Sequence, residues 1–219
     1  DAWARQPCSV TGPWHIVMYA DEISCGNPLS HHQNRKVQAI YWSIEELGPE
    51  ALCDELCWFE AIAVRTTITN EVKGGMSRLA GAIIDQMFGS DTEGAHLGYG
   101  VVTEVLGMQH PVAIFARFGT LVGDVPAVSE IIGAKGASGR VPCPFCRNVV
   151  SLRSGLGALH DDLVPLNCLD ATRFFPHTDE SQRRLLLYLR KRRGELSATA
   201  FQDLTRVHGY SDMVYNILI

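Results

Sequence analysis

An amphipathic stripe between residues 76 and 88 limits most strongly how this chain folds. Its apolar members recur at intervals of three and four residues, with glycines on both flanks: Met76, Leu79, Ala80, Ile83, Ile84, Met87 and Phe88. Residues at this spacing share one face of a helix, so the pattern predicts a helix that packs on an apolar core. The runs before and after it are typical of strands, so the helix must connect strands of an α/β fold.

The predicted strands have a definite order. Three runs rich in β-branched and aromatic residues precede the helix and predict a three-strand meander: Trp14–Ala20, Val37–Ile44 and Cys57–Val64. A fourth strand is predicted over Pro111–Val122, bent or bulged near Gly119, and a short helix follows at about residues 126–132. This order is that of the first part of a ribonuclease-H-like domain, in which a right-handed crossover brings the ends of the first and fourth strands together.

The last third of the chain differs in composition. Gly, Ala, Ser, Pro and Cys dominate residues 134–157, where no periodicity is visible. Helical patterns return at Ser181–Arg193 and Ser197–His208. We therefore expect three parts: the first part of a ribonuclease-H-like core over residues 1–133, a loop-rich insertion over 134–178, and a helical segment over 179–219 that is cut from a longer protein.

Charge and cysteine usage narrow the function classes. The 219 residues carry a formal net charge of -5, with a pI of about 5.9, so any contact with nucleic acid must be local. No apolar run approaches the roughly 20 residues of a membrane-spanning helix, and residues 1–10 lack the apolar core of a secretory signal. Seven cysteines, an odd number with one tight pair, favour a reducing compartment. We expect an intracellular protein of the nucleus or cytoplasm that is not secreted.

Two blocks of short motifs resemble a known family. The first block is Tyr19-Ala-Asp21-Glu22, Gly26-Asn-Pro-Leu29, Arg35-Lys36 and Ala39–Ile44, and the second is Gly123-Asp-Val-Pro-Ala127, Ile132-Gly133 and Pro142-Cys-Pro-Phe-Cys146. In order and spacing, over about residues 14–150, they resemble the catalytic domain of eukaryotic DDE transposases of the Plavaka and Kyakuja-Dileera-Zisupton type. The resemblance implies a ribonuclease-H-like mixed sheet, acidic residues that bind divalent metal, a cysteine-containing insertion and a DNA substrate.

Two carboxylates are candidates for the metal site of such an enzyme. Cleavage and strand transfer by two ions need carboxylates that hold the ions about 3.5 to 4 Å apart. With this resemblance, Asp21 and Asp124 are the predicted catalytic residues and the ligands of Mg²⁺ or Mn²⁺. Glu22 should face the other side of its strand. Structural roles stay open, because Asp124 stands where an aspartate caps a helix and Asp21 precedes a turn-like segment.

The family takes a third acid from a later helix, and no motif after Cys146 matches it. Asp179, Glu180 and Asp212 are available, but each suits a helix cap or a solvated position equally well. Two hypotheses follow: a fragment of an active transposase, or a catalytically inactive transposon-derived domain that binds nucleic acid or another partner. A globular domain of unrelated function is the third alternative, and a homo-oligomer is compatible with each.

A cysteine pair predicts a second metal site. Cys143 and Cys146 have the spacing at which two thiolates reach one zinc ion. Cys168 and His177 would complete a Cys₃His set, with His160 as a substitute for the histidine. A structural zinc would explain how a glycine-rich insertion holds its shape, whereas unliganded cysteines and a redox pair are the alternatives. The remaining cysteines are expected to be core or incidental residues: Cys8, Cys25, Cys53 and Cys57.

A basic segment lies in the helix predicted from Ser181. Six positive charges fall within eleven residues: Arg183, Arg184, Arg190, Lys191, Arg192 and Arg193. Such a face can follow DNA phosphates, with an affinity that falls steeply with salt, or serve as a nuclear localisation patch. A solvated helix face is the alternative. Arg35 and Lys36 would face DNA only under the transposase hypothesis, and His31 and His32 are expected in a surface loop.

Overall fold

The computed structural model describes residues 8–24, 36–89, 96–105, 108–136, 139–152 and 161–211. The chain forms two compact units. The first comprises Asp1–Glu71 and Leu79–Asp124, and the second comprises Val72–Arg78 and Val125–Ile219. The boundaries expected from composition, after residues 133 and 178, both fall inside the second unit.

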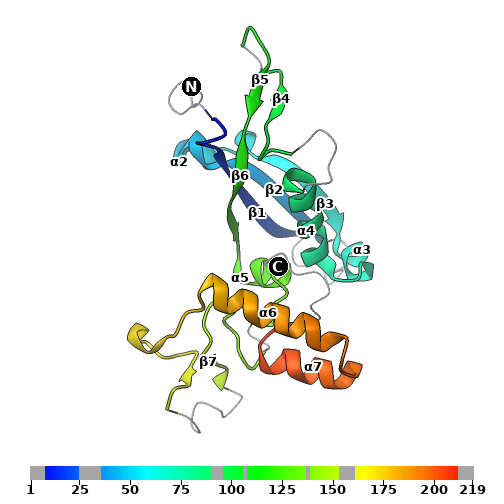
Figure 1. Cartoon of the computed structure of the whole chain (residues 1–219), viewed down its shortest axis with the longest axis vertical. Helices are drawn as coiled ribbons and strands as arrows, with labels where there is room; N and C mark the ends of the chain where they lie inside the picture. The colour runs from blue at the N-terminus through cyan, green and yellow to red at the C-terminus, as the bar shows by residue number, and fades with distance from the viewer. Residues whose placement is uncertain are drawn as a thin grey trace. The chain divides into compact units, whose positions relative to one another are not determined.

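A four-stranded mixed sheet forms the centre of the first unit (Figure 1). Its strands are β1 (Trp14–Ser24), β2 (Lys36–Ile44), β3 (Phe59–Arg65) and β6 (Ala116–Gly123), in the order β3-β2-β1-β6. The pairs β1–β2 and β2–β3 are antiparallel, whereas β1 and β6 are parallel. The predicted meander is present, and the α/β class with a mixed sheet is confirmed.

The first strand is longer than its apolar run predicts. It continues from Ala20 through Asp21 to Ser24, because its register with β2 runs on to the pair Ser24 and Lys36. An apolar pattern detects a strand only where one face is buried, and residues 22 to 24 are exposed. Asp21 is therefore part of the strand and does not begin a turn.

The two faces of β1 differ in burial. The even-numbered residues face the core and are at most 2% exposed at three positions: Ile16, Met18 and Ala20. The odd-numbered residues include three that are only half-buried: His15, Tyr19 and Asp21. Side chains alternate along a strand, so these three share one side of the sheet, which we call the open face.

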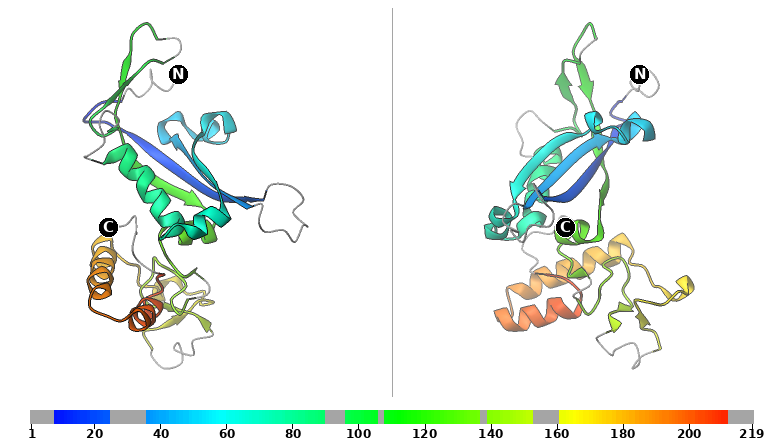
Figure 2. Two further views of the ribbon diagram at one scale, coloured as in Figure 1. Left: turned by 90° about the vertical axis from the view of Figure 1, so that its right-hand side faces the viewer. Right: turned by 180° about the vertical axis from the view of Figure 1, so that it is seen from behind.

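The helix predicted from the amphipathic stripe is α4 (Gly75–Phe88). Its residues from Leu79 onward belong to the first unit and lie beside the sheet (Figure 2). Ala80 of the stripe is fully buried. The helix lies in the connection that carries the chain from β3 back to the start of β6, which is what allows β6 to run parallel to β1.

The prediction of a single strand over Pro111–Val122 is wrong, because the structure has two strands there. β5 (Val112–Ile114) pairs antiparallel with β4 (Val101–Thr103), and β6 begins at Ala116 and pairs with β1. The partner changes at Phe115, and apolar periodicity carries no information about which strand is the partner.

The bulge predicted near Gly119 is confirmed. Phe118 pairs with Ile16 and Thr120 pairs with Val17, so Gly119 is the extra residue of β6. A Cβ at Gly119 would lie 2.9 Å from His15 Cβ, which explains why glycine occupies the bulge. The extra residue sets the register of everything that follows in β6.

Short helical turns join the strands of the meander. Between β2 and β3 lie η2 (Glu45–Leu47), α2 (Pro49–Leu52) and η3 (Glu55–Cys57), and α3 (Thr66–Glu71) follows β3. Ser43 Oγ donates a hydrogen bond to the Cys57 carbonyl at 2.7 Å, and Trp58 Nε1 donates to the Leu52 carbonyl at 3.0 Å. These bonds fix the β2–β3 connection at both of its ends.

The second unit is built around a pair of helices. Its elements are α5 (Val125–Ile131), β7 (Val149–Val150), β8 (Val164–Pro165), η7 (Ala171–Arg173), α6 (Asp179–Arg193) and α7 (Ala198–Val207). The core between α6 and α7 consists of Leu186, Leu189, Phe201 and Tyr210. The three predicted helices are present, although α6 begins two residues early because Thr178 caps it. No helix in the described ranges has the length and apolar character needed to cross a bilayer.

Candidate active site

The parallel pairing of β1 and β6 places Asp21 and Asp124 near each other, at the end of β6. Ala20 is the register partner of Gly123, Asp21 is the next residue of β1, and Asp124 directly follows the end of β6. Tyr19 is likewise the partner of Val122. Alternation along β1 puts Asp21 on the open face with Tyr19, and the charge of Asp124 also acts on Tyr19.

Tyr19 interacts with both carboxylates. Its hydroxyl donates a hydrogen bond to Asp21 Oδ2 at 3.2 Å. The pKa of Tyr19 is raised by burial, by the charge of Asp21 and its hydrogen bond, and by the charge of Asp124. One phenol therefore feels both negative charges. Sequence analysis named Tyr19 only as part of a motif and gave it no role, although its spacing of two residues from Asp21 in a strand is a signal that could have identified one.

Glu22 turns away from this pair, as alternation predicts. Its carboxylate Oε1 lies 2.7 Å from Lys36 Nζ, and each of the two side chains is about one third exposed. Lys36 is thus engaged with Glu22.

The donors at this edge suit a hard cation. Carboxylate oxygens are the ligands that Mg²⁺ and Mn²⁺ prefer, and two carboxylates, one in β1 and one directly after β6, fit the first requirement of a two-ion site. Within the described ranges, no group of three or more His, Cys, Asp or Glu side chains lies close enough together to hold an ion. Asp124 directly precedes α5, so its alternative role as a cap of that helix stays available.

The three candidates for the third acid lie in the carboxyl-terminal part of the chain. Asp179 and Glu180 form the first turn of α6, where a negative charge stabilises the helix, and Glu180 makes an ion pair with Arg184. Asp212 lies outside the described residues, as do other residues singled out above: Cys25, Gly26–Leu29, His31, His32, Arg35 and His160.

The structure brings Cys143 and Cys146 together. Both are free, half-buried thiols. Burial, together with a hydrogen bond and charge from Cys143, raises the pKa of Cys146 to about 11. Two neighbouring thiols on one short loop are what a zinc ion requires of a CxxC pair.

His177 lies beside the cysteine loop, and its backbone holds it there. Cys146 forms a β-bridge with Pro176, and the His177 amide donates to the Phe145 carbonyl at 2.8 Å. Nδ1 of His177 lies 3.0 Å from Ser181 Oγ. Burial and then the charge of Arg147 lower the pKa of His177, so its imidazole favours the neutral form that binds metals.

No such backbone link to the cysteine loop is seen for Cys168 among the described residues. Its amide donates to the Pro165 carbonyl at 2.9 Å and its Sγ lies 3.8 Å from the Asp170 carbonyl. Of the two further ligands expected from sequence, His177 is therefore the better supported, although within the described ranges neither it nor Cys168 completes a group of three close ligands with the cysteine pair. Among the other cysteines, Cys8 is buried, Cys57 is half-buried and Cys53 is exposed.

The basic residues of α6 are partly engaged within the protein. Arg192 makes an ion pair with Glu195, and the guanidinium of Arg193 lies 5.4 Å from the centre of the Phe201 ring. The four exposed members of the set are Arg183, Arg184, Arg190 and Lys191. Local partners lower the positive charge that this helix presents to solvent.

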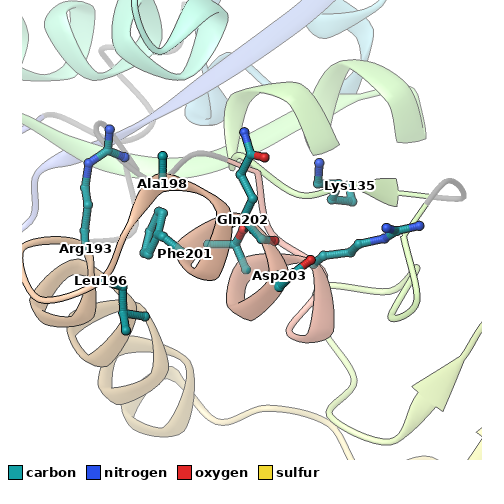
Figure 3. A pocket seen from close by; sticks show the side chains of 9 residues that line it. Lys135, Arg193, Leu196, Ala198, Phe201, Gln202 and Asp203 are labelled. Carbon is teal, nitrogen blue, oxygen red and sulfur yellow. Dashed lines mark hydrogen bonds between the residues drawn. The ribbon is translucent and has the colours of Figure 1, made fainter.

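A cavity of about 760 Å³ lies beside the end of α6 and the start of α7. Figure 3 shows Arg193 and Lys135 on either side of Gln202, with Phe201 between the two helices. Arg206 and Asp203 also line the cavity, which therefore carries three cationic side chains and one anionic side chain. Sequence reasoning missed Lys135 and Arg206 because they are isolated in the chain. This lining suits phosphate groups better than cations.

Comparisons with known proteins leave the family open. No protein-family model matches the sequence, and no curated protein matches it.

Proposed function

We propose that this chain is a fragment of the catalytic domain of a DDE-type transposase that cleaves and joins DNA phosphodiesters with two divalent ions. One observation carries the proposal: Ala20 and Gly123 are parallel partners, and the aspartates that follow them both act on the Tyr19 hydroxyl. The strand order β3-β2-β1-β6, with only the last pair parallel, supports a ribonuclease-H-like arrangement.

Asp21 and Asp124 would hold Mg²⁺ or Mn²⁺ through their carboxylate oxygens. Such ions activate the attacking water or 3′-hydroxyl and stabilise the leaving oxygen. Tyr19 restrains the Asp21 carboxylate by its hydrogen bond, so that the second oxygen is left for the ion. A DNA substrate would also place this protein in the nucleus or the cytoplasm.

Manganese binding and DNA nicking test the proposal. We expect the chain to bind Mn²⁺, followed by electron paramagnetic resonance, and to nick supercoiled plasmid. Asp21→Asn and Asp124→Asn should each weaken Mn²⁺ binding by more than the about 10- to 100-fold that outer-shell changes cost. Glu22→Gln is the matched control, since Glu22 pairs with Lys36 on the other face. Equal Mn²⁺ binding by all four proteins would contradict the proposal.

The cavity at Lys135, Arg193 and Arg206 supports a contact with the DNA backbone in the second unit. The exposed arginines of α6 would extend this contact. The logarithm of the association constant for DNA should then fall linearly with the logarithm of the salt concentration. Cys143, Cys146 and His177 would hold a structural zinc ion, which would stabilise the loop between them.

A second candidate is a catalytically inactive, transposon-derived domain that binds nucleic acid and keeps the zinc. It is favoured by the finding that no third ligand joins the two aspartates within the described ranges. DNA binding with zinc but without Mn²⁺-dependent nicking would support this candidate over the first.

A further inference from the structure

A second cavity, of about 460 Å³, opens on the same face of the sheet as Asp21. It is lined by Tyr19, Tyr41, Leu52, Cys53, Glu55 and Trp58, all in the first unit. This volume lies within the range of about 300–1,000 Å³ that is usual for ligand sites. The cavity combines three aromatic rings with one carboxylate at its margin.

The aromatic walls are preformed. Tyr19 and Tyr41 are direct cross-strand partners in β1 and β2. The ring of Trp58 meets the ring of Tyr19 edge to face, with centroids 5.9 Å apart. Trp58 is anchored by its indole hydrogen bond to the Leu52 carbonyl, so it does not need to reorganise to receive a ligand. A flat aromatic group is the ligand that such walls favour.

Tyr19 belongs to both the cavity and the candidate metal site. Its ring lines the cavity, and its hydroxyl donates to Asp21 Oδ2. A phosphate bound through a divalent ion at Asp21 would therefore lie about one side chain's length from the cavity. In a nucleic acid, the flat group attached to the sugar beside a phosphate is a base.

We infer that this aromatic cavity receives one unstacked base next to a phosphate that is bound through a divalent ion at Asp21. The inference rests on the proposed function. Tyr19, Tyr41 and Trp58 would contact the base by its π faces and edges, as aromatic residues do in single-strand binding sites. The Glu55 carboxylate at the margin would accept a hydrogen bond from an N–H of the base.

The experiment combines a change in the base with a change in the cavity. Fluorescence anisotropy measures the binding of the full chain to short single-stranded DNA in calcium buffer, with an abasic site placed at each position in turn. The same series is run on Cys53→Trp, which fills the cavity from its exposed side, and on Trp58→Ala. Phe59→Ala is the matched control, because Phe59 stacks on Trp42 on the opposite side of the strands.

We expect one position at which loss of the base weakens binding to the native chain and to Phe59→Ala by about tenfold, the scale of one base stacked on aromatic side chains. Cys53→Trp and Trp58→Ala should bind the intact strand about tenfold more weakly and should show no further loss with the abasic site. Circular dichroism establishes that each variant is folded. Cys53→Trp keeps the three aromatic walls, so it decides the outcome if Trp58→Ala unfolds.

Two results would overturn the inference. In the first, every abasic strand binds the native chain as tightly as the intact strand. In the second, Cys53→Trp keeps the full dependence on the base. If Mn²⁺ still binds through Asp21 in either case, only the cavity assignment fails. Absence of both DNA and Mn²⁺ binding would remove the proposed function together with this inference.

Discussion

The Tyr19 hydroxyl donates a hydrogen bond to Asp21 Oδ2 across 3.2 Å, from the same face of β1. Asp124, which is 105 positions further along the chain than Tyr19, adds its charge to the same phenol. The ionisation of this one side chain therefore reports whether the two aspartates converge.

Neutralising either aspartate should lower the pKa of Tyr19. In the native chain, burial and then the charge of Asp21 raise this pKa above 10.0, so the neutral phenol is favoured in the folded state. The stability linked to Tyr19 is present below pH 10 and is lost as pH rises through the raised pKa. NMR of ¹³C-labelled tyrosine, with Tyr19→Phe to assign the signal, follows the titration in Asp21→Asn and Asp124→Asn. Glu22→Gln should leave the pKa of Tyr19 unchanged. An unchanged pKa in Asp124→Asn would mean that Asp124 does not lie close to Tyr19 and Asp21.

The bulge at Gly119 should be sensitive to a single methyl group. A Cβ there would stand 2.9 Å from His15 Cβ and 3.2 Å from the Ile16 carbonyl oxygen, so alanine must displace β1 or β6. We expect Gly119→Ala to lower the free energy of unfolding by about 1–3 kcal/mol in urea titrations. Gly12→Ala is the control, because its Cβ would make only an ordinary contact at 3.5 Å with Ser9 Oγ. Equal stability of the two variants would argue against this register.

Local patterns were sufficient for much of the first unit. The strands of the meander and α4 follow from residues close in sequence, and a single glycine inside an apolar run marks the bulge; each is present. The end of β1 and the split into β5 and β6 depend on pairing with distant strands, which apolar periodicity does not encode. Short helical turns such as α2 also escaped prediction, because four residues are too few to display a period.

The candidate site was predictable in its acids and not in its surroundings. Asp21 and Asp124 stand at the ends of predicted strands, where sequence reasoning looks for ligands. The aromatic cavity combines Tyr19 and Tyr41 of the sheet with Trp58, which the β2–β3 connection brings over them. That convergence depends on the Trp58 and Ser43 hydrogen bonds to the connection, which have no sequence motif.

Glu46 should be worth more to stability than its neighbour Glu45. Its side chain is 6% exposed, and its two oxygens accept from the His15 amide at 2.9 Å and from His15 Nδ1 at 2.6 Å. Arg117 Nε donates to His15 Nε2 at 2.7 Å, so Nδ1 carries the proton that Glu46 accepts. Glu46→Ala leaves these donors without an acceptor and should cost about 1–3 kcal/mol.

Chemical denaturation of Glu46→Ala, Glu46→Gln and Glu45→Ala measures this contribution. Glu46→Gln keeps one acceptor oxygen and should lose less than the alanine variant. Glu45 is exposed, so Glu45→Ala should stay within about 0.5 kcal/mol of the native chain. If Glu46→Ala and Glu45→Ala lose similar amounts of stability, the hydrogen bonds that link Arg117, His15 and Glu46 contribute nothing to the free energy of unfolding.

Zinc removal should affect the second unit, and His177 should matter more than Cys168. Cys143 and Cys146 share one loop, and the His177 amide is bonded to the Phe145 carbonyl between them, whereas Cys168 bonds to its own neighbours at Pro165. We therefore expect Cys143→Ser and His177→Ala to abolish stoichiometric zinc, measured by mass spectrometry of the metal after dialysis, and Cys168→Ser to reduce it less. A chelator should lower the melting temperature of the native chain, since bound metal adds to the free energy of folding.

Cys53→Ser is the control, because this exposed thiol belongs to the first unit. Equal zinc content in the native chain and in Cys143→Ser would contradict the site, and an identical loss in Cys168→Ser and His177→Ala would restore the full Cys₃His set.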